Sequence, residues 1–191
     1  MGIYLNPGSA MFQKSLKSKI YVDKSGLLAI LNELVDTEQR YVCVSRPRRF
    51  GKSMAANMLA AYYGSSEDTS ALFASLEISQ CAGYRDHLNQ YDVLKINMQD
   101  FLSESQSIED MLAHLTACLI RDLKNGFPQI DFSYAKSLVS VMREVFAQTG
   151  RSFVILIDEW DCLCKYLSHY RNQTLSIRKI NLWKTIFQIS D

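Results

Sequence analysis

The chain has 191 residues, of which 48% are hydrophobic and 21% are charged, and this balance is typical of a folded domain and excludes intrinsic disorder. Its formal net charge of +1 gives no global field that would attract nucleic acid or anionic lipid, so contact with nucleic acid stays open only as a local interaction. Apolar runs such as residues 153–157 are far shorter than the roughly 20 residues of a membrane helix. The first 30 residues lack the apolar core of a signal peptide, and we expect a cytoplasmic protein with no membrane partner.

The first half of the chain predicts a helix, a strand and a second helix, in that order. Residues 23–35 place apolar side chains on one helical face, and Asp23 or Ser25 could cap the first turn. Residues 41–44 form a short β-rich apolar run, which predicts a strand. Residues 53–63 contain good helix formers throughout, so the second helix follows the strand after a tight loop.

The second half of the chain predicts two strands with two helices between them. Residues 92–98 begin as an apolar run and then alternate, as a strand does, whereas residues 107–124 and 134–148 repeat apolar positions at helical spacing. Residues 153–157 are continuously apolar, which is typical of a central parallel strand covered on both faces. Strands that alternate with helices predict an α/β fold with a parallel sheet flanked by helices.

The loop after the first predicted strand fits a phosphate-binding P-loop, or Walker A motif. Its residues are Arg46, Pro47, Arg48, Arg49, Phe50, Gly51, Lys52 and Ser53. Arg46 stands where the general pattern has its first glycine. Gly51 allows a close turn, Lys52 adds a positive charge, and Ser53 offers a hydroxyl to Mg²⁺. We expect the loop to bind nucleotide phosphates, with a solvated surface loop as the alternative for the three arginines.

Two adjacent carboxylates follow the last predicted strand, as in a Walker B motif. Asp158 and Glu159 lie at the C-terminal end of residues 153–157, the end at which open α/β sheets bind ligands. We expect Asp158 to hold the Mg²⁺ that Ser53 also contacts. Glu159 would orient and deprotonate the attacking water, and Glu159 and Lys52 are the predicted catalytic residues. The alternative is a strand that ends in solvated acids.

Three segments together resemble the AAA-ATPase-like family of bacterial and archaeal proteins. They are residues 21–25 (YVDKS), 46–53 (RPRRFGKS) and 157–161 (IDEWD). In that family the loop characteristically reads Arg-Pro-Arg-Arg-Phe-Gly-Lys-Ser, so the resemblance implies that Arg46 is the family's own form. The resemblance covers about residues 4–165 and implies an AAA-type P-loop NTPase fold that binds ATP with Mg²⁺.

The resemblance also carries expectations for other parts of the chain. It suggests that residues 21–24 line the adenine pocket, with Tyr21 and Asp23 as the nucleotide-binding residues, and a helix N-terminus capped by Asp23 is the alternative. Family members often carry a restriction-endonuclease-like nuclease domain after the ATPase, and this chain ends before any such domain. We therefore expect a P-loop domain over residues 1–165, a truncated or atypical tail over 166–191, and a sheet that is incomplete at the C-terminus. Its open edge would favour a homo-oligomer.

The leading functional hypothesis is an ATP-binding domain with slow Mg²⁺-dependent hydrolysis that drives an attached or partner domain. A nucleotide-dependent interaction module without turnover and a nucleic-acid-processing protein remain as alternatives. A Ser-His-Asp or Cys-His hydrolase is not indicated, because the three histidines are scattered without a nucleophile at recognisable spacing.

Overall fold

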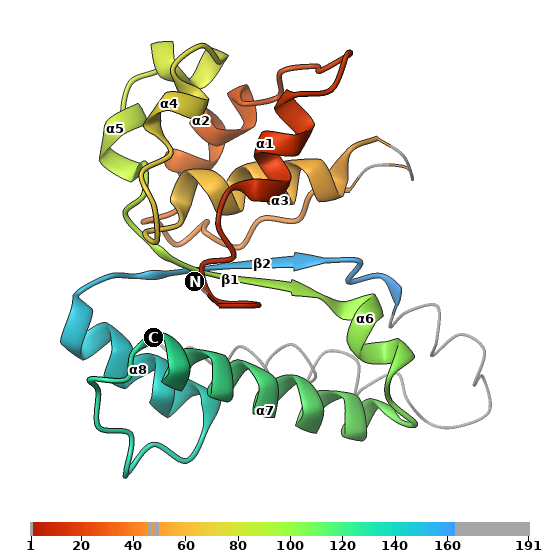
Figure 1. Cartoon of the computed structure of the whole chain (residues 1–191), viewed down its shortest axis with the longest axis vertical. Coiled ribbons are helices and arrows are strands. Elements are labelled where there is room, and N and C mark those ends of the chain that lie inside the picture. The colour runs from red at the N-terminus through yellow and green to blue at the C-terminus, as the bar shows by residue number, and fades with distance from the viewer. Residues whose placement is uncertain (1, 46, 48–49, 163–191) are drawn as a thin grey trace. The chain divides into compact units, whose positions relative to one another are not determined.

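The structure is a computed structural model, and it describes residues 2–45, 47 and 50–162. These residues divide into two compact units (Figure 1). The first unit comprises Ile3–Lys95 together with Arg151–Leu156, and the second comprises Ile96–Gly150 together with the described residues from Ile157 onward.

The first unit is mostly helical. Its helices are α1 (Ala10–Leu16), α2 (Gly26–Asn32), α3 (Lys52–Tyr63), α4 (Ser70–Phe73), the 3-10 helix η1 (Glu77–Gln80) and α5 (Tyr84–His87). It also contains the first residues of β1 (Asp92–Asn97) and of β2 (Phe153–Asp158), which pair in a parallel two-stranded sheet. The backbone N–H of Asp92 donates to the carbonyl of Ser152 at 3.0 Å, which sets the start of this pairing.

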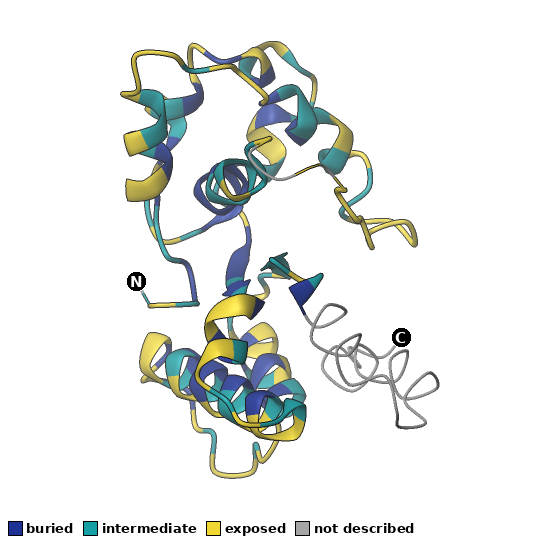
Figure 2. Cartoon of the chain, turned by 90° about the vertical axis from the view of Figure 1, so that its right-hand side faces the viewer, coloured by how far each residue is buried: buried dark blue, intermediate teal, exposed yellow. Residues whose placement is uncertain are grey.

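Aromatic side chains form much of the core of the first unit around the C-terminal half of α3. Figure 2 colours the backbone by the burial of each residue. Phe12 stacks on Phe73 with ring centroids 5.1 Å apart, and Tyr62 meets Phe73 edge to face at 5.3 Å. The Tyr62 hydroxyl donates to the carbonyl of Tyr84 at 2.7 Å and accepts from the Asn32 amide at 2.9 Å. These hydrogen bonds satisfy a hydroxyl that is fully buried, so the tyrosine fixes α3 against α2 and α5 without leaving an unpaired polar group.

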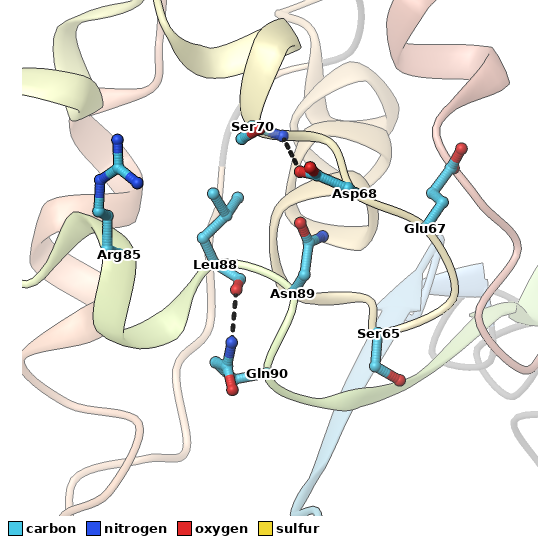
Figure 3. A pocket seen from close by; sticks show the side chains of 8 residues that line it. All are labelled: Ser65, Glu67, Asp68, Ser70, Arg85, Leu88, Asn89 and Gln90. Carbon is cyan, nitrogen blue, oxygen red and sulfur yellow. Dashed lines mark hydrogen bonds between the residues drawn. The ribbon is translucent and has the colours of Figure 1, made fainter.

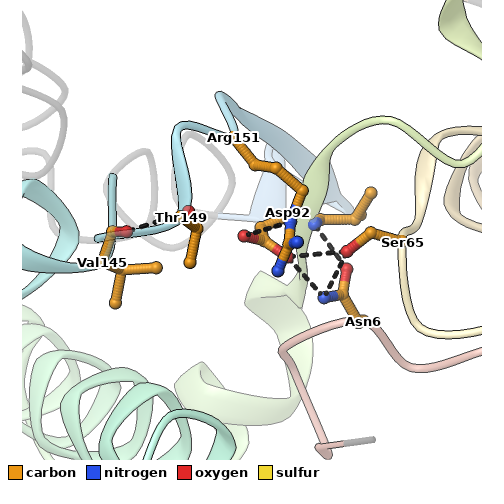
Figure 4. A network of polar contacts seen from close by, with 7 residues as sticks. Asn6, Ser65, Asp92, Val145, Thr149 and Arg151 are labelled. Atoms are coloured by element: carbon orange, nitrogen blue, oxygen red, sulfur yellow. Dashed lines mark hydrogen bonds and ion pairs between the residues drawn. The ribbon is translucent and has the colours of Figure 1, made fainter. Parts of the chain in front are cut away.

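A buried carboxylate joins four segments of the first unit (Figure 4). Asp92, at the start of β1, is 0% exposed. It accepts hydrogen bonds from the Asn6 amide at 2.9 Å and the Ser65 hydroxyl at 2.8 Å, and it pairs with the Arg151 guanidinium at 3.3 Å. Asn6 also pairs with the backbone of Val93, with its N–H donating to the Val93 carbonyl and its side-chain oxygen accepting from the Val93 N–H, both at 2.7 Å. The N-terminal segment, the turn after α3 and the approach to β2 are therefore held by one side chain.

The second unit contains α6 (Met98–Ser103), α7 (Ile108–Gly126) and α8 (Leu138–Thr149). The apolar faces of α7 and α8 pack on each other, with Leu115 and Val141 among their fully buried side chains. Ser107 caps α7 by accepting from the backbone N–H of Asp110 at 3.1 Å. Serine is a favoured N-cap because its oxygen satisfies one of the first N–H groups of a helix.

Most of the predicted elements are present. The structure confirms the elements predicted over residues 53–63, 92–98, 107–124 and 153–157, with ends that differ by a few residues. The helix predicted over 23–35 is shorter, because the chain forms turns after Asn32. The helix predicted over 134–148 begins at Leu138, where Ser137 and Ser140 form a capping box that fixes the first turn.

The strand predicted over residues 41–44 is wrong. These residues have no regular secondary structure, and Tyr41, Val42 and Val44 are 73%, 47% and 40% exposed. A strand forms only where a neighbour completes its hydrogen bonds, and in the described residues β1 and β2 pair with each other. The expectation that residues 153–157 are covered on both faces is also wrong, because they are only half-buried.

The mixture of helices and a small parallel sheet is compatible with the predicted α/β class. The complete AAA-type sheet stays a prediction, and so does the domain boundary after residue 165, which lies outside the described residues. Among the helices of the described residues, none has the length and apolar composition that crossing a bilayer requires.

Replacing Asp92 with Ala should lower the free energy of unfolding by about 3 kcal/mol, because it removes the acceptor of the Asn6 and Ser65 donors and the ion pair with Arg151. Chemical denaturation at neutral pH measures this loss. The control is Asp86→Ala, which removes an exposed carboxylate from α5 and should change stability by less than about 0.5 kcal/mol. Equal effects of the two substitutions would contradict the role given to Asp92.

The buried tyrosines predict a loss of stability at high pH. Burial raises the pKa of Tyr62 to about 12 and that of Tyr91 to about 12. Between about pH 10 and 12 the unfolded chain has lost tyrosine protons that the folded chain retains, so stability should fall as the pH rises through this range. Thermal unfolding against pH tests this. Tyr62→Phe should reduce the loss of stability between about pH 10 and 12. Tyr134→Phe, at a side chain that is 91% exposed, should leave this loss unchanged.

Candidate functional site

The N-terminus of α3 has the backbone of an anion-binding site. Gly51 is its N-cap residue and has φ 81°, in the left-handed region that favours glycine. The first helical hydrogen bond runs from the N–H of Ala55 to the carbonyl of Gly51 at 2.9 Å, and no side chain caps the helix. The N–H groups of Lys52, Ser53 and Met54 therefore have no acceptor within the helix. With the positive end of the helix dipole, they fit the negative charge of a phosphate.

A second lysine contacts this turn from another part of the first unit. The Lys24 ammonium donates to the carbonyl of Phe50 at 2.9 Å. A Cβ atom on Gly51 would lie 3.1 Å from the same nitrogen, so glycine here provides both the left-handed backbone and the space for the ammonium. The sequence predicted Lys24 only as part of residues 21–24 near the adenine, and it did not predict this contact with the Walker A turn. The signal was its place in the segment 21–25, which is part of the family resemblance.

The residues on either side of Lys24 are fixed by hydrogen bonds to η1. Asp23 accepts from the N–H of Glu77 at 2.8 Å, and the Ser25 hydroxyl, which is buried, accepts from the N–H of Ile78 at 3.1 Å. Asp23 also accepts from the N–H of Ser25 at 2.8 Å. Partial burial raises the pKa of Asp23, but these backbone hydrogen bonds outweigh burial and hold the pKa below its usual value. Neither side chain caps α2, so the predicted capping role is wrong.

Tyr21 lies against the core of the first unit. Its ring meets Phe12 edge to face with centroids 6.4 Å apart, and the side chain is half-buried. Burial, followed by the neighbouring Asp23 carboxylate, raises the pKa of Tyr21. This position gives the ring a packing role, and contact of Tyr21 or Asp23 with an adenine stays a prediction.

The structure describes only part of the predicted Walker A loop. Arg46, Arg48 and Arg49 lie outside the described residues. Pro47 is exposed, and Phe50 is 60% exposed. Lys52 and Ser53, the first two residues of α3, are half-buried and exposed respectively, so both are accessible to a ligand at this turn.

The predicted Walker B acids occupy a strained turn at the end of β2. Glu159 has φ 52°, a left-handed conformation that costs a non-glycine residue about 1–3 kcal/mol and often occurs at functional sites. Its N–H donates to the Asp158 carboxylate at 2.9 Å, and its carbonyl accepts from the N–H of Cys162 at 3.1 Å. Both carboxylates are half-buried. They belong to the second unit, whereas Lys52 and Ser53 belong to the first.

A shallow polar cavity of about 380 Å³ lies elsewhere in the first unit (Figure 3). Its lining residues are Ser65, Glu67, Asp68, Ser70, Arg85, Leu88, Asn89 and Gln90. Several of the polar groups stabilise local turns: the Asn89 amide donates to the carbonyl of Gly64 at 2.8 Å, and Asp68 accepts from the N–H of Ser70 at 2.9 Å. No predicted site residue lines this cavity. In the part of the chain that the structure describes, no group of three or more His, Cys, Asp or Glu residues could hold a metal ion.

Comparisons with known proteins match the chain over most of its length. A family model described as "Predicted AAA-ATPase" matches residues 9–189. A protein of Azotobacter chroococcum mcd 1, named "Uncharacterized protein in vnfD 5'region", is 28% identical over 142 residues, which are 74% of this chain and 25% of that protein. The chain thus spans about a quarter of the length of this relative. No solved structure matches it. The match to the family model, together with the segments of residues 21–25, 46–53 and 157–161, shows that the chain belongs to the AAA-ATPase-like family.

Proposed function

We propose that the protein binds ATP with Mg²⁺ at the N-terminus of α3 and hydrolyses it to drive an attached or partner domain. The observation that supports this most directly is the left-handed Gly51 at the N-cap, followed by a first turn whose N–H groups have no acceptor in the helix. Membership of the AAA-ATPase-like family supports a nucleotide as the anion. Hydrolysis of the bound ATP is proposed in addition to its binding.

The residues at this turn have separate roles in the proposal. The N–H groups of residues 52–54 donate to phosphate oxygens, and Lys52 adds a mobile positive charge. The Ser53 hydroxyl and the Asp158 carboxylate are oxygen ligands of the kind that Mg²⁺ prefers. The bound Mg²⁺ supplies charge neutralisation on the phosphates. The residues fit the cofactor in chemistry, because the first turn of α3 offers donors and no acidic side chain.

Glu159 has the chemistry of a water-positioning residue. A carboxylate can accept a proton from an attacking water, and phosphoryl transfer depends more on positioning and charge than on covalent steps. Its left-handed backbone fixes the direction in which the side chain leaves the end of β2. The proposal assigns metal binding to Asp158 and water activation to Glu159, so the two acids should be separable by mutation.

ATP with Mg²⁺ should raise the melting temperature of the protein, because a ligand that binds only the folded state at 100 times its Kd adds about 2.7 kcal/mol. Lys52→Ala should remove most of this gain, and Lys17→Ala, at an exposed lysine next to α1, should retain it. Differential scanning calorimetry with and without the nucleotide measures the effect. If the wild type and Lys52→Ala gain equally at millimolar ATP, the site is not at α3.

Substitutions at the end of β2 should separate binding from turnover. Glu159→Gln should keep the affinity for Mg²⁺-ATP and slow its hydrolysis, whereas Asp158→Asn should remove the Mg²⁺ dependence of binding. Binding is measured by calorimetric titration and turnover by phosphate release. Glu159→Gly is the control for folding, because glycine accepts φ 52° without strain, and it should slow turnover without loss of stability. Equal losses of binding and turnover in both acid variants would indicate a structural pair.

A further inference from the structure

We propose that Lys24 is a second phosphate-binding lysine of this site, which contacts the polyphosphate of the nucleotide from the α2 side of the turn. This inference rests on the proposed function and adds to it a residue outside the Walker A motif. Its basis is the contact between the Lys24 ammonium and the carbonyl of Phe50, directly before the glycine that begins α3.

The backbone around Lys24 is positioned before any ligand binds. Asp23 and Ser25, its neighbours on both sides, each accept a hydrogen bond from a backbone N–H at the start of η1. The carbonyl of Lys24 accepts from the N–H of Leu27 at 3.1 Å, which continues the chain into α2. A residue held on both sides loses little further backbone entropy when its side chain binds a ligand.

The Lys24 side chain keeps donors for an anion while it contacts the loop. A lysine ammonium has three N–H donors, and the Phe50 carbonyl takes one of them. Because the side chain is exposed, its other N–H groups can form hydrogen bonds with a phosphate oxygen without burial of the charge. The 3.1 Å separation between this nitrogen and a Cβ built on Gly51 places the charge beside the turn that presents the α3 N–H groups.

Two lysines therefore flank one glycine, Lys52 next to it in the chain and Lys24 next to it in space. Such a pair favours ligands with several phosphates, because the repulsion between two ammonium groups is relieved most by a multiply charged anion. Lys24 therefore contributes to the binding of the phosphate chain and does not select the base of the nucleotide.

A structural role for Lys24 makes a different prediction. If its hydrogen bond only shapes the loop, a neutral donor can replace it, and the charge is irrelevant. Lys24→Gln keeps an N–H donor without the charge, Lys24→Met removes both, and Lys24→Arg keeps both. The three substitutions thus separate the charge from the hydrogen bond.

The experiment is calorimetric titration of ATP and of inorganic tripolyphosphate, both with Mg²⁺, into the wild-type chain and these three variants. Tripolyphosphate has no base, so it reports contacts with phosphate alone. We expect Lys24→Gln and Lys24→Met to weaken both ligands by about tenfold to a hundredfold, the range of a charge-assisted hydrogen bond, and Lys24→Arg to bind within about threefold of the wild type. Lys19→Gln, at an exposed lysine between α1 and α2, should bind like the wild type.

Two affinity results would contradict the role proposed for Lys24. If Lys24→Gln binds both ligands with wild-type affinity, the contact of Lys24 with the loop is only structural. If Lys24→Arg loses as much affinity as Lys24→Met, the charge does not account for the effect. Thermal unfolding without ligand checks the fold of each variant, and we expect melting temperatures no more than about 4 °C below the wild type. If the wild type binds ATP and only the Lys24 result fails, the proposed function stands and this inference falls. If the wild type binds no ATP, both fall.

Discussion

The left-handed backbone at Gly51 is the constraint on which the candidate site depends. At φ 81° a side chain is strained, and a Cβ atom would also approach the Lys24 ammonium at 3.1 Å. Because the residue before α3 turns in this way, the helix begins without a capping side chain, and its first N–H groups have no serine or aspartate oxygen as an acceptor. The backbone groups that begin the helix are therefore the ones that the proposed phosphate binding would use.

The rest of the first unit holds α3 in place for this role. The N-terminal half of the helix is half-buried or exposed, whereas the residues from Met58 to Tyr63 are buried among aromatic side chains. The Asp92 network ties the turn after α3 to β1 and to the N-terminal segment. A helix that is anchored at one end and open at the other can bind an anion at the open end without reorganising its core.

The sequence predicted the helices and strands whose boundaries depend on local chemistry. It did not predict features that depend on contacts between segments far apart in the chain. The glycine and the helix formers around residue 51 were sufficient to predict α3, and apolar spacing was sufficient for α7. The β-rich run at residues 41–44 is not a strand, because strand formation needs a hydrogen-bonding partner that no local pattern specifies. The contact of Lys24 with the Walker A turn was not predicted for a related reason: Lys24 lies 26 positions before Phe50 in the chain, and only the fold brings them together.

The central claim is that the first turn of α3 binds nucleotide phosphates, and NMR of the ¹⁵N-labelled chain tests it most directly. Backbone amide signals of Lys52, Ser53 and Met54 report whether their N–H groups gain an acceptor when ATP with Mg²⁺ is added. The account predicts that these amides show the largest saturable shifts, because their hydrogen bonds change from water to phosphate oxygen. Saturable shifts elsewhere with these three signals unchanged, or no shifts at millimolar ATP, would contradict it.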